Sequence, residues 1–176
     1  MLIRIAEIND ATAISVVHID TWKTTYRGMV PDYIIDGLDY VKNNERWRQT
    51  LSQGEDKRTF VAIEANEKIV GFATAGPNRN GQYKFDGELY AIYILKHYQG
   101  QGFGRGLVNA VAKWLLSNGC HSMILWVLRE NPARYFYEAL GGKFITTEMV
   151  EIGNSFLDEV SYGWDDLNCL LKKNDC

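Results

Sequence analysis

A run of alternating glycines, QGQGFGRG at residues 99–106, is the feature of this chain that most restricts its fold. It stands between an apolar segment and a helical pattern that extends from about Phe103 to Ser117. The missing Cβ atoms allow backbone N–H groups to approach a ligand closely. The start of the helix adds unpaired N–H groups and a positive dipole end. We therefore predict an anion site, for a phosphate or a pyrophosphate. The alternative is a glycine-rich turn that holds no ligand.

The spacing of these glycines excludes two common nucleotide-binding loops. A dinucleotide fingerprint needs G-x-G-x-x-G, but the sixth residue is Arg105 when counted from Gly100 and Leu107 when counted from Gly102. A P-loop ends in Gly-Lys-Ser or Gly-Lys-Thr, and the chain contains neither triplet. Both patterns therefore disfavour a nucleotide or phosphate binder of another fold.

Length and composition predict one domain over residues 1–176, because 176 residues that are 46% hydrophobic can bury a substantial core. No apolar run approaches the ~20 residues of a membrane-spanning helix, so we expect no membrane partner. The net charge of −3, without a basic cluster, disfavours nucleic acid as a partner.

The cysteines and histidines predict a metal-free, cytoplasmic protein. Three cysteines form no C-x-x-C pair, which favours reduced thiols: Cys120, Cys169 and Cys176. The start of the chain, residues 1–5, is typical of a strand rather than of a signal peptide. The histidines are isolated in the sequence and form no recognisable metal site.

Hydrophobic periodicity indicates strands and helices that follow one another in a single α/β domain with a mixed sheet. The helices are expected after Asp10 as an N-cap, from Pro31 through Ile35, over 43–51, over 103–117 and from Asn131-Pro132. The expected strands are residues 2–6, 59–63, 68–73, 88–95, 122–128, 144–150 and 159–164. The segment 88–95 is apolar after its first residue, as in a central strand that is covered on both faces.

Two segments lie in register with these elements. Gln99, Gly102 and Gly104 match the pattern [QR]-x-x-G-x-[GA], and residues 131–141 match N-x-A-x-x-F-Y-E-x-x-G. Together they resemble the motifs of the GNAT superfamily of N-acetyltransferases, specifically from about residue 88 to 144 and more loosely in the N-terminal third. The resemblance implies a mixed, mostly antiparallel sheet of about seven strands. That sheet would be flanked by helices and splayed between its fourth and fifth strands.

The resemblance also implies acetyl-CoA as the cofactor, with its pyrophosphate on the glycine loop. In the family, the pantetheine arm pairs with the end of the fourth strand, where an exposed edge offers backbone partners to its two amides. Asn131 matches a position that often bonds this arm, although a simple N-cap also explains it. The implied cofactor-binding residues are Ile92, Tyr93, Ile94, Gln99, Gly100, Gln101, Gly102, Phe103, Gly104, Arg105, Asn131, Ala133 and Phe136.

Acetyl transfer to an amine requires a neutral nucleophile, a donor to the oxyanion and a proton for the departing thiolate. Tyr137 matches the family tyrosine that is taken as the general acid, and a phenol with a pKa near ~10 is protonated at neutral pH. Its place on an apolar helix stripe is explained equally by core packing. Glu88 opens the central strand and is the better candidate for the general base, since the fifth strand carries no carboxylate. A surface glutamate is the alternative.

Trp22 and Tyr26 lie in an aromatic N-terminal region that forms part of the acceptor pocket in this family. Aromatic faces can receive a cationic amine, and aromatics at helical spacing can equally be core. The prediction is acetyl-CoA-dependent transfer to a primary amine, of a small molecule or a peptide, by direct attack in a ternary complex. Homodimers are common in the family. The alternatives are an acyl-CoA-binding module without transfer activity, and transfer of a different acyl group.

Overall fold

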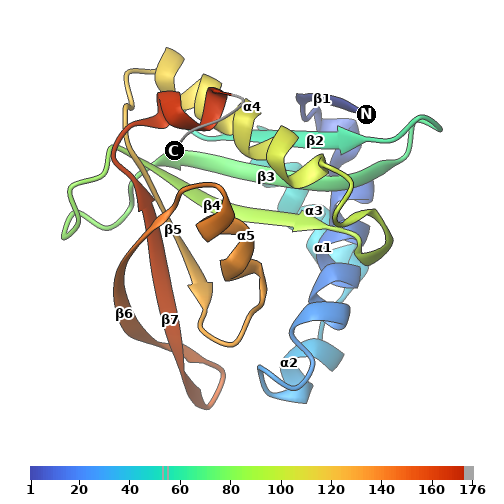
Figure 1. Ribbon diagram of the computed structural model, residues 1–176. Helices are drawn as coiled ribbons and strands as arrows, with labels where there is room; N and C mark the ends of the chain where they lie inside the picture. The colour runs from blue at the N-terminus through green and yellow to red at the C-terminus, as the bar shows by residue number, and fades with distance from the viewer. Residues whose placement is uncertain (53, 55, 173–176) are drawn as a thin grey trace.

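The computed structural model describes residues 1–52, 54 and 56–172. Its sheet has seven strands in the order β1-β2-β3-β4-β5-β7-β6 (Figure 1). The pair β4–β5 is parallel and the other neighbouring pairs are antiparallel, which confirms the expected mixed, mostly antiparallel sheet. The strands are β1 (Leu2–Ile5), β2 (Arg58–Ile63), β3 (Ile69–Pro77), β4 (Gly87–Ile94), β5 (Met123–Leu128), β6 (Lys143–Ile152) and β7 (Ser155–Trp164).

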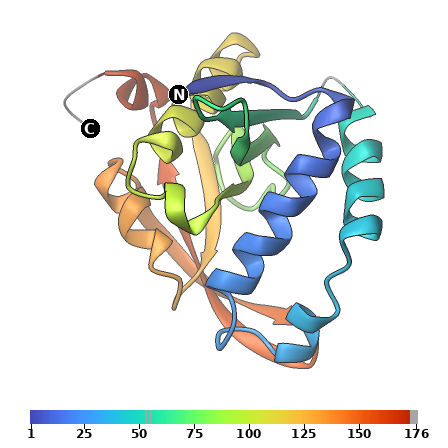
Figure 2. The ribbon, with the colours of Figure 1, turned by 90° about the vertical axis from the view of Figure 1, so that its right-hand side faces the viewer.

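Helices cover both faces of this sheet. They are α1 (Ala11–Thr25), α2 (Asp32–Asp36), α3 (Tyr40–Ser52), α4 (Phe103–Ser117) and α5 (Ala133–Ala139), with the 3-10 turns η1 (Ile8–Asp10), η2 (Lys96–Tyr98) and η3 (Leu167–Leu171). Side chains alternate along a strand, so Ala62 and Val70 pack in one core with α4, whereas Val61 and Phe72 pack in another with α1 and α3. Figure 2 shows α1 and α3 side by side, away from α4.

The start of α1 agrees only in part with the prediction that Asp10 caps this helix. The Asp10 carboxylate accepts hydrogen bonds from the Arg4 guanidinium at 2.6 and 2.9 Å and from the Glu7 N–H at 2.7 Å. The bond with Arg4 is the main cause that keeps the pKa of Asp10 below its usual value. Asp10 is the N-cap residue of α1, as predicted, but its side chain makes no capping bond to this helix. The carboxylate instead bonds the N–H of Glu7, the N-cap residue of the preceding turn η1.

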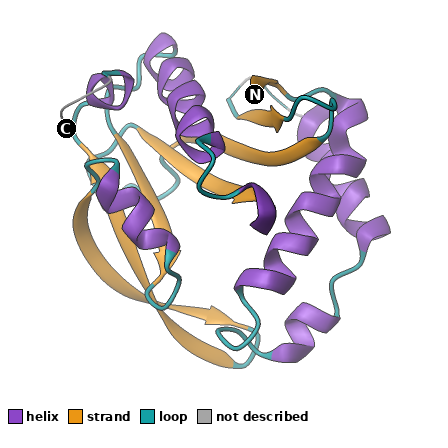
Figure 3. Cartoon of the chain, turned by 45° about the vertical axis from the view of Figure 1, so that its right-hand side comes forward, coloured by secondary structure: helices purple, strands orange, loops and turns teal. Residues whose placement is uncertain are grey.

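The sheet opens between β4 and β5. These strands pair only from Gly87–Met123 to Leu89–Leu125, although β4 continues to Ile94 and β5 to Leu128. The register between β3 and β4 also shifts, so that Tyr90 is an extra residue of β4, and such a bulge bends its strand. Figure 3 shows the two strands running apart. The structure thus confirms the splay expected between the fourth and fifth strands.

A second contact joins the two parts of the sheet at the far end of the opening. Val30 and Ile35 pack with Leu128 of β5, and the Asn154 N–H donates a hydrogen bond to the Tyr33 hydroxyl at 2.9 Å. The helix α2 therefore rests against the hairpin of β6 and β7, as Figure 2 shows.

The cysteines depart in part from the expectation of reduced thiols. Cys120 is a free thiol, whereas Cys169 is disulfide-bonded, so the prediction is wrong for Cys169. Cys176 lies outside the described residues. None of the described helices combines the length and the hydropathy that a membrane span requires.

Candidate active site

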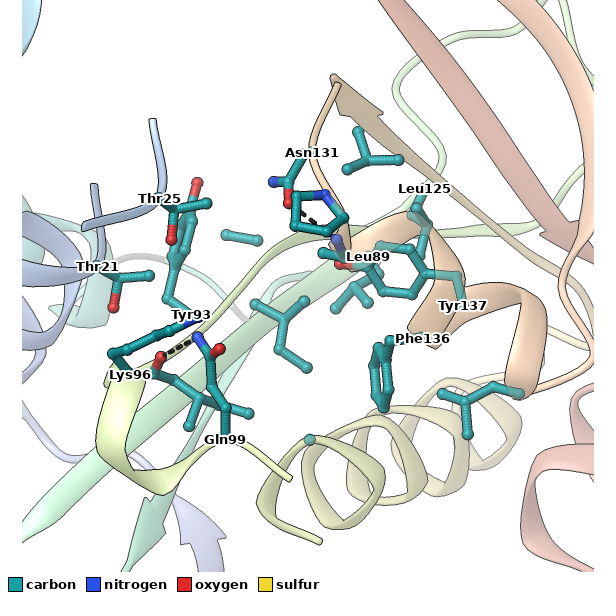
Figure 4. Close-up of a pocket in the computed structure, with 18 of the residues that line it drawn as sticks. Thr21, Thr25, Leu89, Tyr93, Lys96, Gln99, Leu125, Asn131, Phe136 and Tyr137 are labelled. Atoms are coloured by element: carbon teal, nitrogen blue, oxygen red, sulfur yellow. Dashed lines mark hydrogen bonds between the residues drawn. The ribbon is translucent and has the colours of Figure 1, made fainter. Parts of the chain in front are cut away.

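A cavity of about 770 Å³ occupies the opening between β4 and β5 (Figure 4). Its walls come from the C-terminal end of α1, from β4 and β5, from the glycine loop and from α5. The predicted site residues that line it are Tyr26, Ile92, Tyr93, Ile94, Gln99, Gly100, Gly102, Gly104, Arg105, Asn131, Ala133, Phe136 and Tyr137. Segments that are far apart in the sequence thus meet at one place.

The glycine loop reaches this cavity through alternate residues. Gly100 and Gly102 have φ angles of +75° and +88°, in the left-handed region that favours glycine, and Gly102 directly precedes α4. The intervening residues turn elsewhere: the Gln101 side chain donates a hydrogen bond to the His97 carbonyl at 2.7 Å, and Phe103 is buried in the core. Gln101 and Phe103 can therefore meet a ligand through their backbone but not through their side chains.

The free edge of β4, next to the glycine loop, presents backbone N–H and C=O groups to the cavity. The Leu95 N–H donates to the Val70 carbonyl of β3 at 2.9 Å, so by strand alternation the backbone groups of Ile94 and Ile92 face away from β3, toward the opening. The Gln99 side chain donates to the Ile94 carbonyl at 3.0 Å (Figure 4). Gln99 thereby ties the loop to the end of the strand.

Tyr137 projects from α5 into the cavity and is 6% exposed. Burial is the main cause that raises the pKa of its phenol, and the nearby Tyr93 adds to the effect. Burial likewise raises the pKa of Tyr26 and of Tyr93. All three phenols therefore keep their protons at neutral pH, and each can donate a hydrogen bond.

Asn131 has the capping role that its sequence predicts. Its Oδ1 accepts a hydrogen bond from the N–H of Ala133, the first residue of α5, at 2.9 Å, so its side chain caps the helix from one position before the N-cap residue Pro132. Its Nδ2 donates to the Tyr26 hydroxyl in a long contact of 3.5 Å. The buried Asn131 side chain thus connects the start of α5 with the end of α1 beside the cavity.

The two aromatic residues of the predicted acceptor pocket differ in position. Tyr26 lines the cavity, whereas Trp22 packs behind it, with 4.8 Å between the ring centroids. Trp22 also contacts His18, and burial lowers the pKa of His18 to about 4, so this histidine is neutral. Trp22 therefore supports the wall and does not form it.

Glu88 is not placed as a general base requires. Its side chain is buried, and the exposed Arg79 guanidinium forms an ion pair with it. The Arg79 N–H also donates to the Glu88 carboxylate at 3.0 Å, and Glu88 is absent from the described cavity lining. The geometry thus argues for a structural role, with Glu88 anchoring the loop before β4.

The choice between a catalytic and a structural role for Glu88 has a direct test in Glu88→Gln. We expect kcat to stay within about twofold of the wild type, because no reacting group depends on Glu88. Losing the charge-assisted bonds to Arg79 should lower the free energy of unfolding by about 1–2 kcal/mol. Steady-state kinetics and urea denaturation measure the two effects. A fall in kcat of more than tenfold would restore Glu88 as the base.

A carboxylate that sequence reasoning missed lies further along the sheet. Glu159 of β7 is opposite Leu128 of β5 and Glu148 of β6. It is half-buried, and within the described part of the chain its carboxylate has no hydrogen bond or ion pair. Burial raises its pKa, and the neighbouring carboxylates of Glu148 and Glu88 add to this. Glu159, like Glu88, is absent from the described cavity lining, so its raised pKa alone does not make it the general base.

Trp126 and four residues in or just after α1 also line the cavity without having been predicted to do so. Trp126 comes directly after Leu125, the last residue of β5 that pairs with β4, and so lies where the sheet opens. The apolar pattern of residues 122–128 indicates only a buried strand. The other four residues are Thr21, Thr24 and Thr25 of α1 and Met29, which follows this helix.

The chain matches the model of the acetyltransferase (GNAT) family over residues 22–142. It is 38% identical over 168 residues to the uncharacterized N-acetyltransferase YuaI of Bacillus subtilis, covering 96% of this chain and 95% of that protein. The chain therefore belongs to the GNAT family of acetyltransferases.

Solved structures share the fold. One is the ribosomal-protein-alanine N-acetyltransferase of Brucella melitensis, with a TM-score of 0.73 and 21% identity over 93% of this chain and 99% of that one. Another is the PaiA N-acetyltransferase of Thermoplasma acidophilum in complex with coenzyme A, with a TM-score of 0.68 and 23% identity over 90% and 98% of the two chains.

The residues at the cavity fit the chemistry of coenzyme A. The loop N–H groups and the basic side chains of Lys96 and Arg105 suit phosphates, and the β4 edge suits the amides of pantetheine. Within the described part of the chain, no group of three or more His, Cys, Asp or Glu side chains is arranged to hold a metal ion.

Proposed function

We propose that this protein is an acetyl-CoA-dependent N-acetyltransferase that acts on a primary amine in a ternary complex. One observation carries the proposal: the glycine loop, the free edge of β4 and Tyr137 line the same cavity. A loop that only connected a strand to a helix would not need these three features together.

In this proposal, the two sides of the opening bind different parts of the donor. The backbone N–H groups of residues 100–105 bind the pyrophosphate, with Lys96 and Arg105 nearby. The edge of β4 at Ile92 and Ile94 pairs with the amides of the pantetheine arm. When bound, acetyl-CoA supplies an acetyl group as a thioester. The binding groups hold that thioester at the splay, beside Tyr137.

The acceptor amine enters from the α1 side and attacks in its neutral form. A backbone N–H near Ile94, on the cavity side of β4, stabilises the negative charge that develops on the acyl oxygen. Tyr137 donates its phenolic proton to the departing sulfur, and its raised pKa keeps that proton available at neutral pH. The nitrogen–carbon bond forms as the carbon–sulfur bond breaks, and the proton that the amine nitrogen loses returns to the Tyr137 oxygen, so that the phenol is regenerated. Direct attack needs no covalent intermediate on the protein.

The proposed activity and its class of acceptor are tested with acetyl-CoA and a panel of primary amines, with release of free thiol as the readout. The panel contains a peptide with N-terminal alanine, spermidine, tyramine and lysine, so that it samples α-amines, polyamines, arylalkylamines and side-chain amines. We expect thiol release above the no-amine rate with at least one class, and mass spectrometry should show a product heavier by one acetyl group.

Two controls separate the alternatives. Coenzyme A binding without thiol release across the panel would favour an acyl-CoA-binding module. Faster turnover with succinyl-CoA than with acetyl-CoA would favour another acyl donor.

A further inference from the structure

Thr21 of α1 lines the cavity, and its side-chain hydroxyl is buried and lacks a partner among the described residues. The residue is 3% exposed and lines the cavity. Its Oγ1 has no hydrogen bond within the described part of the chain. A buried polar group without a partner destabilises a protein by about 1–3 kcal/mol. A change of the χ1 rotamer, of which a helical threonine has two, would turn this oxygen toward the cavity, and a ligand that then hydrogen-bonds to it would remove that penalty.

The neighbouring threonine shows that the missing bond is specific to Thr21. A threonine in a helix usually bonds a carbonyl one turn earlier. Thr24 does so, because its hydroxyl donates to the carbonyls of Asp20 at 2.9 Å and Thr21 at 3.1 Å. Thr21, on the same helix, leaves its hydroxyl free of such a bond.

The other buried atoms without a partner in the described part do not compete as ligand contacts. They belong to Trp22, Asn43 and Arg58, and none of these residues lines the cavity. Thr25, four residues after Thr21 and on the same helix face, does line it. Figure 4 shows Thr21 and Thr25 next to each other, beside Tyr93.

The position of α1 identifies which ligand meets these hydroxyls. The helix α1 packs in the core on one face of the sheet, and α4, which begins at the glycine loop, packs in the core on the opposite face. A group that reaches Thr21 from the α1 side is therefore the acceptor and not the phosphate end of the donor. A hydroxyl accepts a hydrogen bond from an amine N–H without requiring a charge.

We propose that Thr21, with Thr25, hydrogen-bonds the amine-bearing end of the acceptor and is a substrate-positioning residue. This inference rests on the proposed function and adds the residue that selects the acceptor. It assigns the hydrogen bond to Thr21 Oγ1, which the free protein leaves unpaired.

The test is Thr21→Val, which removes the hydroxyl and nearly keeps the shape. We expect the KM for the best amine of the panel to rise about fivefold to tenfold, as for the loss of one neutral hydrogen bond. The KM for acetyl-CoA should stay within twofold. The melting temperature should be unchanged or higher, because the variant loses a hydroxyl that had no partner. Thr21→Ser, which keeps the hydroxyl, should restore most of the affinity for the amine.

Thr74→Val is the matched control. The hydroxyls of Thr74 and Thr59 form a buried hydrogen bond of 3.0 Å, and neither residue lines the cavity. This variant should melt at a lower temperature and keep both KM values.

Two results would overturn the inference in different ways. Suppose that the wild type acetylates an amine and that Thr21→Val either keeps the KM for this amine or melts at a lower temperature, as Thr74→Val does. The role assigned to Thr21 is then wrong, and the enzyme assignment stands. If the wild type releases thiol with no amine of the panel, both proposals fail.

Discussion

Replacing Gly102 with alanine should raise the KM for acetyl-CoA at least tenfold. The φ angle of Gly102 is +88°, and this left-handed conformation costs a residue with a Cβ about 1–2 kcal/mol. The loop can relieve the strain by shifting, but its N–H groups then lose their alignment with the pyrophosphate. Steady-state kinetics with varied acetyl-CoA, and calorimetry with coenzyme A, measure the loss.

Gly119 provides a control for this substitution at the other end of α4. Its φ angle is +81°, and an added Cβ meets no atom within 4 Å, as at Gly102. Gly119 lies away from the cavity. Gly119→Ala should therefore reduce stability by a similar amount and leave the KM for acetyl-CoA unchanged. Equal effects of both variants on this KM would show that the glycine loop does not bind the donor.

Replacing Tyr137 with phenylalanine should lower kcat about 10- to 100-fold and change both KM values little. The loss is expected at or below the lower end of the range for general acids, because a thiolate leaves without full assistance. The wild type should also retain activity through pH 10, where an ordinary phenol loses its proton, because burial holds the pKa of Tyr137 above its usual value. Rates measured from pH 7 to 10.5 test this.

Tyr162 is the matched control for Tyr137. It is buried next to Tyr137, with 6.4 Å between the ring centroids, but its hydroxyl donates to the Glu138 carboxylate instead of facing the cavity. Tyr162→Phe should lower stability and keep kcat. Wild-type turnover in Tyr137→Phe would exclude this tyrosine as the proton donor while leaving the fold assignment intact.

The parts of the fold that depend on residues close together in the sequence could be predicted from the sequence. The Asn131 cap, the helix after the glycine loop and the strands of the central sheet all follow from local periodicity and capping. The splay was expected from the family resemblance alone. In the structure, it depends on β4 and β5 ceasing to pair beyond Leu89, which no single segment encodes.

The candidate site was less predictable where a side chain depends on a distant partner. Arg79 comes from the loop before β4 and forms an ion pair with Glu88, a contact that no local pattern around Glu88 indicates. The Asp10 carboxylate is directed to Arg4 and the turn η1 rather than to α1. Trp126 and Thr21 line the cavity only because of how the sheet opens, so their local patterns look like ordinary core.

The contact of α2 with the β6–β7 hairpin has a consequence for the order of catalytic events. The opening between β4 and β5 is closed at one end by the short β4–β5 pairing and at the other end by this contact. The opening is therefore enclosed within the sheet and does not extend to its edge. In the proposed function, the donor and the acceptor would then enter from opposite faces of the sheet. We expect neither to obstruct the entry of the other, so that a random order of addition is sterically permitted.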